Sequence, residues 1–183
     1  MKLSLLVCNL AERKFDMQKL MHDDVEVLVL TDNGEMTIGA KRQKLLCMSR
    51  GEYVAFVDDD DEITQDYFDL ALPNLDGNND YVAVSAIMRH NNEDTIIRTS
   101  KDYEYGSLPD GSLTRPPQHW GIIRRDIALK VGFEDTSYED RAFSQQLQKL
   151  VKKEFIIPSP TYLYNWSGYK DYSIGYHHPK NHT

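Results

Sequence analysis

The sequence lacks a long hydrophobic run. A helix that crosses a membrane needs about 20 consecutive apolar residues, and no stretch of the 183 residues approaches this length. The apolar run at residues 2–8 is also too short for the hydrophobic region of a secretion signal. We therefore expect a soluble, unprocessed protein without a membrane span.

Cysteines are scarce, with only Cys8 and Cys47. Cys8 lies in an apolar strand pattern and Cys47 in an apolar helix pattern. Both positions favour small buried hydrophobic side chains over a disulfide or a metal site. A reducing compartment, the cytoplasm, is the simplest location that fits this usage.

Basic residues are fewer than acidic ones, 21 against 29, which gives a formal net charge of -8. This balance does not attract phosphate polymers, so a nucleic-acid partner would need a local basic patch. Internal repeats, low-complexity runs and flexible linkers are absent as well, and 40% of the residues are hydrophobic. These features predict one compact domain over residues 1–183, with a polar loop at residues 100–118.

The order of apolar runs and turn residues predicts an α/β fold. We expect strands at residues 2–8, 25–31 and 53–57, and each is followed by a helix, at residues 14–22, 37–50 and 64–72. Later strands are expected at residues 81–87, 95–98, 122–123, 155–157 and 162–164, and helices at 126–131 and 139–151. Such an order predicts a mostly parallel mixed sheet flanked by helices.

Polar residues follow three of the predicted strands. Asn9, Asp32 and Asp58 each stand just after a strand end. Because ligands of such sheets bind outside the carboxyl ends of the strands, these three residues should converge on one crevice.

Asp58 begins an acidic loop that continues through Asp59, Asp60, Asp61 and Glu62. Two such charges about 4 Å apart repel by ~1 kcal/mol in water and by ~4 kcal/mol at intermediate dielectric. Mg²⁺ and Mn²⁺ relieve this repulsion, since they bind one or two carboxylates together with phosphate oxygens. The alternative is a solvated acidic loop or the start of a helix.

Lys41 and Arg42 fall in the first turn of the helix expected from Thr37, where a cation costs ~0.3–1 kcal/mol. A helix start with two cations and Gly39 suits the diphosphate of a nucleotide. Ion pairs with the acidic loop or with Asp32 are the alternative.

Two blocks of sequence carry a family resemblance. Residues 38–43 followed by 49–61 resemble family 2 glycosyltransferases of the GT-A fold, with a basic helix start, Gly-Glu-Tyr, and a strand ending in Asp-x-Asp-Asp. Residues 131–135 and 138–141 are similar to the Gly-x-Phe-Asp-Glu stretch and the Glu-Asp motif of that family. The blocks follow the family's order, and the compact chain is similar to single-domain versions found in bacteriophage genomes.

The resemblance implies a Rossmann-like GT-A fold and an inverting transfer of a hexosyl or pentosyl group from a nucleoside-diphosphate sugar to a hydroxyl acceptor. Residues 1–100 would be the nucleotide-sugar and metal half, and residues 101–183 the acceptor and catalytic-base half. The cofactor would be Mn²⁺ or Mg²⁺, and a phage origin would place the enzyme in the host cytoplasm.

The resemblance also implies roles for single residues. Asp58 and Asp60 would be the Asp-x-Asp pair, with Asp60 as the direct metal ligand and Asp58 nearer the donor ribose. Asp59 belongs to the same donor loop, and Asp32 would sit near the donor base, with Asn9 beside it.

Asp140 would be the general base that takes the proton from the acceptor hydroxyl, and Glu139 is the second candidate. For both, ordinary helix-start chemistry is the alternative, because carboxylates favour the first turn.

Three further residues are weaker candidates. In the family the region of His119 and Trp120 faces the acceptor, so Trp120 would stack on a sugar or a base, although a core tryptophan is the more common case. His178 would complete the metal site, against the alternative of an unanchored tail. Gln43 stands where the family has asparagine, and the acceptor-side segments are short, so the acceptor is open among glycans, proteins and modified nucleic-acid bases.

Two other functions compete. A catalytically silent module would bind a nucleotide or a divalent cation without turnover. A nucleotidyltransferase also has a doubly wound domain and paired carboxylates, but its first strand is usually followed by a glycine-rich basic loop, and residues 9–13 contain no glycine.

Overall fold

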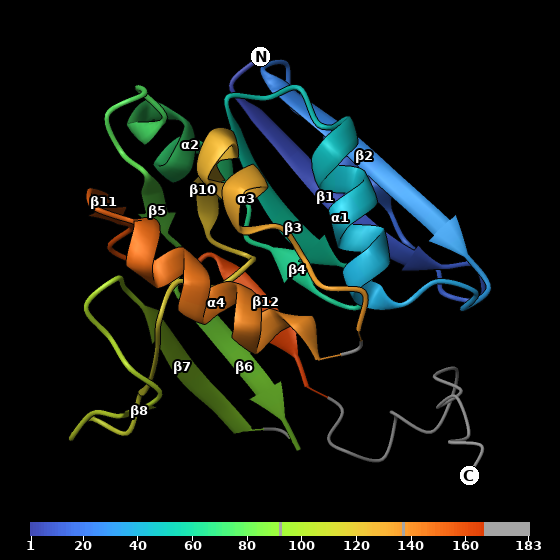
Figure 1. The fold of residues 1–183 in the computed structure, drawn as a ribbon. Helices are drawn as coiled ribbons and strands as arrows, with labels where there is room; N and C mark the ends of the chain where they lie inside the picture. The colour runs from blue at the N-terminus through green and yellow to red at the C-terminus, as the bar shows by residue number, and fades with distance from the viewer. Residues whose placement is uncertain (92, 137, 167–183) are drawn as a thin grey trace, which may run out of the picture.

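The chain folds into two sheets with helices packed on them, as a computed structural model that describes residues 1–91, 93–136 and 138–166 shows (Figure 1). The first sheet has six strands, in the order β11 (Glu154–Ile156), β5 (Tyr81–Ala83), β10 (Ile122–Arg124), β3 (Tyr53–Asp58), β1 (Leu3–Leu10) and β2 (Val25–Asp32). Strand β1 runs parallel to β2 and β3, whereas β10 runs antiparallel to its two neighbours. The predicted mixed α/β fold flanked by helices is confirmed.

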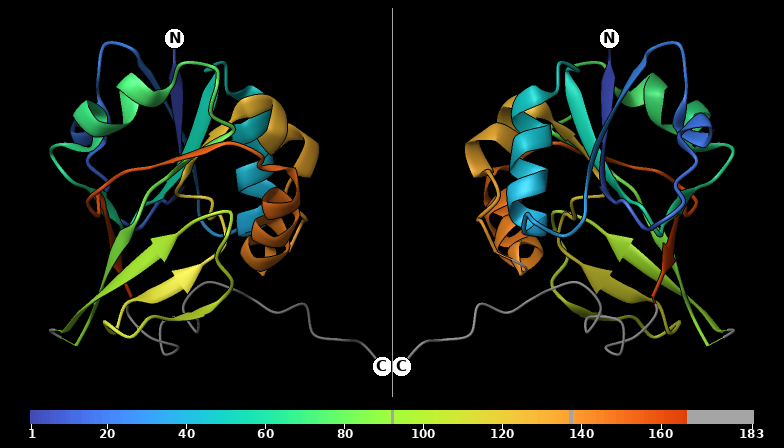
Figure 2. Two further views of the ribbon diagram at one scale, coloured as in Figure 1. Left: turned by 90° about the vertical axis from the view of Figure 1, so that its left-hand side faces the viewer. Right: turned by 90° about the vertical axis from the view of Figure 1, so that its right-hand side faces the viewer.

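The central strands are buried on both faces, which explains their unbroken apolar runs. Leu5 and Ala55 point into one hydrophobic cluster, and Leu6 and Phe56 point into the other. Helices α1 (Ile38–Met48), α3 (Arg125–Val131) and α4 (Glu139–Leu150) cover one face of the sheet (Figure 2). The opposite face carries α2 (Tyr67–Ala71) and the second sheet.

The second sheet also has six strands, in the order β4 (Glu62–Ile63), β12 (Tyr162–Asn165), β6 (Ala86–His90), β7 (Glu93–Thr99), β9 (Leu113–Arg115) and β8 (Gly106–Ser107). The sequence predicts that the later strands extend a single sheet, and only β5, β10 and β11 do so. The run at residues 81–87 is split between the sheets at Val84. Its carbonyl accepts side-chain hydrogen bonds from Thr99 and from Trp120, each 3.1 Å long, in place of a strand partner.

Two expected helices are shorter than predicted. Residues 14–22 contain only the 3₁₀ turn η1 (Met17–Leu20), in which Leu20 alone is buried. Helix α2 ends at Ala71 and is followed by a second 3₁₀ turn, η2 (Leu72–Asn74). Pro73 in this turn has no N–H group to donate, so the α-helix cannot continue through it. The described residues form no helix that is long and apolar enough to cross a membrane.

The segment of residues 134–136, which leads into α4, packs on the start of α1. The hydroxyl of Thr37 caps α1 by accepting from the Ala40 N–H at 3.1 Å, and the Gly39 N–H donates to the Thr136 carbonyl at 3.2 Å. A Cβ at residue 39 would lie 1.9 Å from the carbonyl oxygen of Glu134. Only glycine permits this approach, which fixes the start of α4 relative to α1.

Gly39→Ala should therefore destabilise the protein. The added methyl group forces the 134–136 segment away from α1, and such overpacking typically costs about 1–3 kcal/mol. Urea unfolding measures the loss, with Lys44→Ala on the exposed side of α1 as a control that should change stability by less than about 0.5 kcal/mol. Wild-type stability in Gly39→Ala would contradict the packing described.

The two cysteines differ in exposure. Cys8 is buried in β1, and burial raises the pKa of its thiol to about 12. Cys47 is exposed on α1, where its sulfur lies 3.3 Å from the Gln43 amide nitrogen. The expectation that both are buried is wrong for Cys47, because α1 turns that side to solvent.

Cys47 alone should react with a water-soluble disulfide reagent in the native protein. The thiolate is the reactive form, and Cys8 combines burial with a raised pKa. Absorbance of the released thiolate before and after unfolding measures this. Cys47→Ser should remove the fast phase, and a fast phase that persists in this variant would place Cys8 at the surface.

Candidate active site

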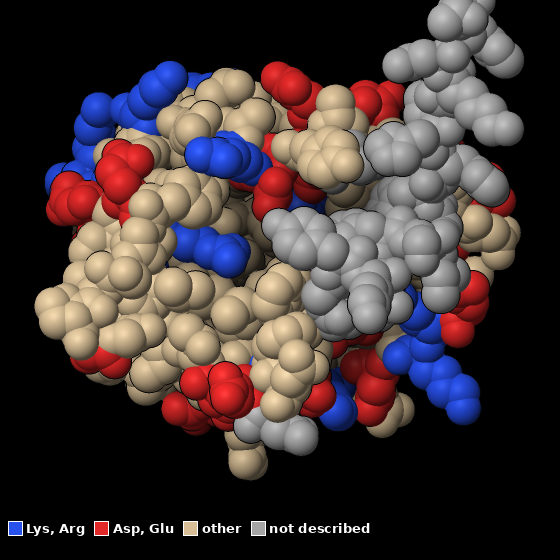
Figure 3. Space-filling view, turned by 90° about the horizontal axis from the view of Figure 1, so that it is seen from below, with Lys and Arg blue, Asp and Glu red and all other residues tan. Residues whose placement is uncertain are grey.

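The carboxyl ends of β1, β2 and β3 bring the predicted donor residues together. In the sheet register Asn9 is opposite Thr31, Leu10 is opposite Asp32, and Cys8 is opposite Asp58. The expected convergence of the three strand ends is thus present. These strands point toward the face shown in Figure 3, which is hollowed and carries both acidic and basic side chains at the edge of the hollow.

Lys41 and Asp32 form a buried ion pair at the carboxyl end of β2. Lys41 is 3% exposed, its ammonium contacts the Asp32 carboxylate, and it donates to the Asn9 carbonyl at 3.2 Å. Burial opposes ionisation of Asp32, but the hydrogen bond from Lys41 and two from the backbone leave its pKa below the usual value. The side-chain oxygen of Asn9 is buried and has no hydrogen-bond partner in the described part of the chain.

Arg42 is the centre of a second buried cluster and is 4% exposed. Its Nη2 donates to both carboxylate oxygens of Asp58, at 2.8 and 3.0 Å, and its Nη1 pairs with Glu139. The Nε2 of His119 lies 3.0 Å from Nη2. Burial would raise the pKa of Asp58, but the charge of Arg42 and the contact with His119 hold it well below its usual range.

These contacts bear on the two interpretations of the basic pair, which can hold in turn with and without a ligand. Both Lys41 and Arg42 make ion pairs, as the alternative to a phosphate site stated. The start of α1 is also occupied, because the Gly39 N–H bonds to Thr136 and the Ala40 N–H to Thr37. The N–H groups of Gly39 and Ala40 are therefore not free to bind the diphosphate that is predicted at this helix start.

The acidic loop holds its aspartates in different surroundings. Asp59 accepts from the Leu10 N–H at 2.7 Å and from Arg13 at 2.6 Å. Asp61 accepts from the Tyr162 hydroxyl and from the Asn165 N–H, both at 2.8 Å. These two buried carboxylates fasten the loop to its neighbours.

Asp60 is the exposed aspartate of the loop, and Glu62 is equally exposed. The Asp60 side chain is 46% exposed, and Arg13 lies 3.0 Å from one of its oxygens. Partial burial and the charge of Asp58 raise the pKa of Asp60, and the same causes raise that of Asp61. Burial is the larger cause, and the repulsion from Asp58 is the part that a cation would relieve.

The donor set fits a hard divalent cation. Asp58 and Asp60 offer carboxylate oxygens, and Mg²⁺ or Mn²⁺ takes one or two of these and completes its shell from phosphates and water. No group of three or more candidate ligands is arranged for a metal within residues 1–91, 93–136 and 138–166, so the described side chains do not form a closed cage. His178, the predicted third ligand, lies outside the described residues.

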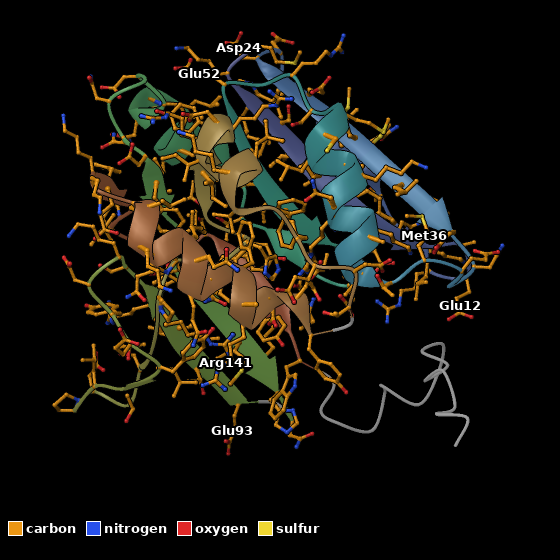
Figure 4. All side chains as sticks on the ribbon, in the orientation of Figure 1. Glu12, Asp24, Met36, Glu52, Glu93 and Arg141 are labelled. Atoms are coloured by element: carbon orange, nitrogen blue, oxygen red, sulfur yellow. The ribbon has the colours of Figure 1, made fainter. Side chains whose placement is uncertain are left out.

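The two candidate bases at the start of α4 differ in access. Glu139 is 3% exposed and tied to Arg42, and its pKa is raised by burial although Arg42 opposes this. Asp140 is exposed, and one of its oxygens accepts from the Arg141 N–H at 2.7 Å. Its neighbour Arg141, labelled in Figure 4, has its guanidinium carbon 5.3 Å from the centroid of the Tyr105 ring. Asp140 is thus accessible to solvent, whereas Glu139 is enclosed in a buried ion pair.

His119 and Trp120 are buried rather than presented to an acceptor. Trp120 is 4% exposed and stacks on Tyr162 and Tyr164, with ring centroids 5.7 and 6.1 Å away. These residues lead into β10, which lies between β3 and β5 within the first sheet. As placed, Trp120 is the core tryptophan of the alternative interpretation, and His119 faces Arg42 and Asp58.

Sequence reasoning missed two residues that shape the loop. Arg13 bridges Asp59 and Asp60, and Tyr162 holds Asp61 while accepting from the Asp58 N–H at 3.3 Å. A lone arginine shortly after the first strand end was a usable signal for the first. The second has no local signal, because Tyr162 is remote from the loop in sequence.

Comparison with solved structures finds S. aureus TarS. One TarS structure superposes with a TM-score of 0.68 at 18% identity, covering 91% of this chain and 37% of TarS. Residues 1–349 of TarS in complex with UDP-GlcNAc give a TM-score of 0.65 at 16% identity, covering 97% of this chain and 62% of that one. The chain therefore spans less than two thirds of these relatives, and the similarity confirms the GT-A glycosyltransferase fold.

Sequence comparisons agree with the fold. A search of curated proteins finds no significant match. The model of the family "Glycosyl transferase family 2" matches residues 14–155, a range that contains α1, the acidic loop and the start of α4. Because this match covers most of the chain, the protein belongs to glycosyl transferase family 2.

Proposed function

We propose that the protein is an inverting, metal-dependent glycosyltransferase that uses a nucleoside-diphosphate sugar. The observation that carries the proposal is that Arg42 joins two parts of the site. Its guanidinium contacts Asp58, at the carboxyl end of β3, and also Glu139, the residue before the exposed Asp140. In this proposal one site combines oxygen ligands for a donor diphosphate with an open carboxylate at a helix start. The UDP-GlcNAc complex of TarS supports a uridine diphosphate donor as the first to test.

The donor nucleoside would lie against the ends of β1 and β2. The side-chain oxygen of Asn9 is unpartnered and would have to be uncovered by a small local movement to accept from the donor, and Asp32 keeps a charged carboxylate beside Lys41. Asp58 would bind the ribose, and Asp59 would keep the loop in place rather than contact the donor directly. We assign no phosphate contact to Arg42, because carboxylates already hold its guanidinium.

Asp60, with Asp58, would hold Mn²⁺ or Mg²⁺ against the diphosphate. When bound, such an ion stabilises the negative charge that develops on the leaving nucleoside diphosphate. Burial and the charge of Asp58 raise the pKa of Asp60, and a bound cation would lower it again by stabilising the carboxylate. Asp60 is thus the ligand whose removal should affect donor binding most.

Asp140 would act as the general base. Its carboxylate accepts the proton of the acceptor hydroxyl while the hydroxyl oxygen attacks the anomeric carbon of the donor. The bond from the anomeric carbon to the diphosphate oxygen breaks in the same displacement, so the configuration at that carbon inverts. The nucleoside diphosphate leaves with the electron pair of the broken bond.

Donor binding should depend on the cation and on Asp60. UDP, GDP, CDP and dTDP are tested by calorimetry and thermal shift with and without Mn²⁺, on the wild type and on Asp60→Ala. One diphosphate should stabilise the wild type only with the cation, and Asp60→Ala should lose this effect. Asp69→Ala, an exposed carboxylate on α2, should bind as the wild type does, and failure of every diphosphate to bind would exclude the proposed function.

Asp140→Asn should abolish turnover while leaving donor binding intact. General bases contribute about 10²–10⁴-fold, so release of nucleoside diphosphate from the sugar donor, with water as acceptor, should fall by that range. Diphosphate affinity should stay within about twofold, and Glu134→Gln on the preceding exposed segment is the control. A wild type that binds a diphosphate but never turns over the sugar donor would instead support the silent binding module.

A further inference from the structure

Arg42 is enclosed by parts of the chain that are far apart in sequence. Asp58 ends β3, His119 precedes β10 and Glu139 begins α4, and all three contact the guanidinium of this one α1 residue. The rings of Phe56 and Phe133 lie 6.0 Å from the guanidinium carbon. A cation this buried has its partners fixed, because leaving either carboxylate or the guanidinium unpaired is strongly unfavourable.

The contacts require an arginine. Nη2 donates to Asp58 while Nη1 pairs with Glu139. Only the planar guanidinium group of arginine can donate to two carboxylates in fixed directions. The Nε of Arg42 is buried without a partner within the described residues. The guanidinium is therefore oriented toward the two carboxylates at the expense of one of its own hydrogen bonds.

The start of α4 depends on this contact. Tyr138, the residue before the helix, makes no side-chain capping hydrogen bond. The helix start is held instead by the Glu139 pair with Arg42 and by the 134–136 segment on Gly39. Asp140 follows Glu139 directly, so a shift of the Arg42 guanidinium shifts the carboxylate proposed as the base.

We propose that Arg42 is a positioning residue that places Asp140 through Glu139 and makes this placement depend on Asp58. The inference rests on the proposed function. Asp58 belongs to the loop that would bind the donor. Donor binding would therefore strengthen the series of side-chain contacts that runs from Asp58 through Arg42 to Glu139. The base is then held in its productive position when the donor is bound.

Arg42→Lys tests this role. Lysine keeps the charge but not the planar guanidinium group, and a misplacement of about 1 Å costs on the order of 100-fold in rate. The rate of diphosphate release at saturating sugar donor should fall by about 10–100-fold, with the donor KM and the diphosphate Kd within about threefold of wild type. Glu139→Gln should act in the same direction, and the double variant should be no slower than the slower single variant, because both changes break one chain of contacts.

Arg124→Lys is the matched control. Arg124 also bridges two carboxylates, Asp80 at 2.9 Å and Asp126 at 2.7 Å, but it lies at the far end of β10 from the site. Its kinetic constants should equal those of the wild type. A loss of diphosphate affinity of tenfold or more in Arg42→Lys with an unchanged maximal rate would make Arg42 a donor-binding residue and overturn the inference, as would additive effects in the double variant.

Hydrogen exchange of the wild type tests the coupling without a substitution. Amides at residues 139–143 should exchange more slowly when the diphosphate and Mn²⁺ are bound, because the start of α4 is then held more firmly. Unchanged exchange in a protein shown by calorimetry to bind the diphosphate would overturn the positioning role and leave the proposed function standing. A wild type that binds no diphosphate would end both.

Discussion

Charge balance at the carboxyl ends of β1, β2 and β3 is the constraint on which the rest of the structure depends. Acidic side chains outnumber basic ones there; the acidic ones are Asp32, Asp58, Asp59, Asp60, Asp61 and Glu139, and the basic ones are Lys41, Arg42 and Arg13. Buried charges are tolerated only when they are paired, so each cation in the core has a fixed partner. The excess of negative charge remains at the surface of the loop, where Asp60 is exposed.

The four aspartates of the acidic loop therefore have different structural roles, although their side chains are chemically identical. Asp59 ties the loop to the residues after β1, and Asp61 ties it to β12 in the second sheet. Asp58 faces inward to Arg42. Three carboxylates are used to hold the loop in shape, which leaves Asp60 in a fixed position with solvent access. This arrangement suits a ligand that brings its own cation and its own phosphate oxygens.

The sequence predicts the first half of the fold well, because strands buried on both faces leave unbroken apolar runs such as residues 53–57. It does not predict the second sheet, since the break at Val84 depends on Thr99 and Trp120, which reach it from later segments. The convergence of Asn9, Asp32 and Asp58 followed from strand order alone. The preference for Asp140 over Glu139 came from the family resemblance, and what the sequence did not show is that Glu139 is buried against Arg42.

The attachment of the acidic loop to β12 has a consequence for how the protein is made. The hydrogen bond from the Asn165 N–H to Asp61 joins residues 104 positions apart, so the loop closes late on any folding route that begins with local contacts. During synthesis the parallel core of β1, β2 and β3 can assemble while the later residues are still inside the ribosome. The nascent chain can consequently form its three parallel strands before the acidic loop is complete.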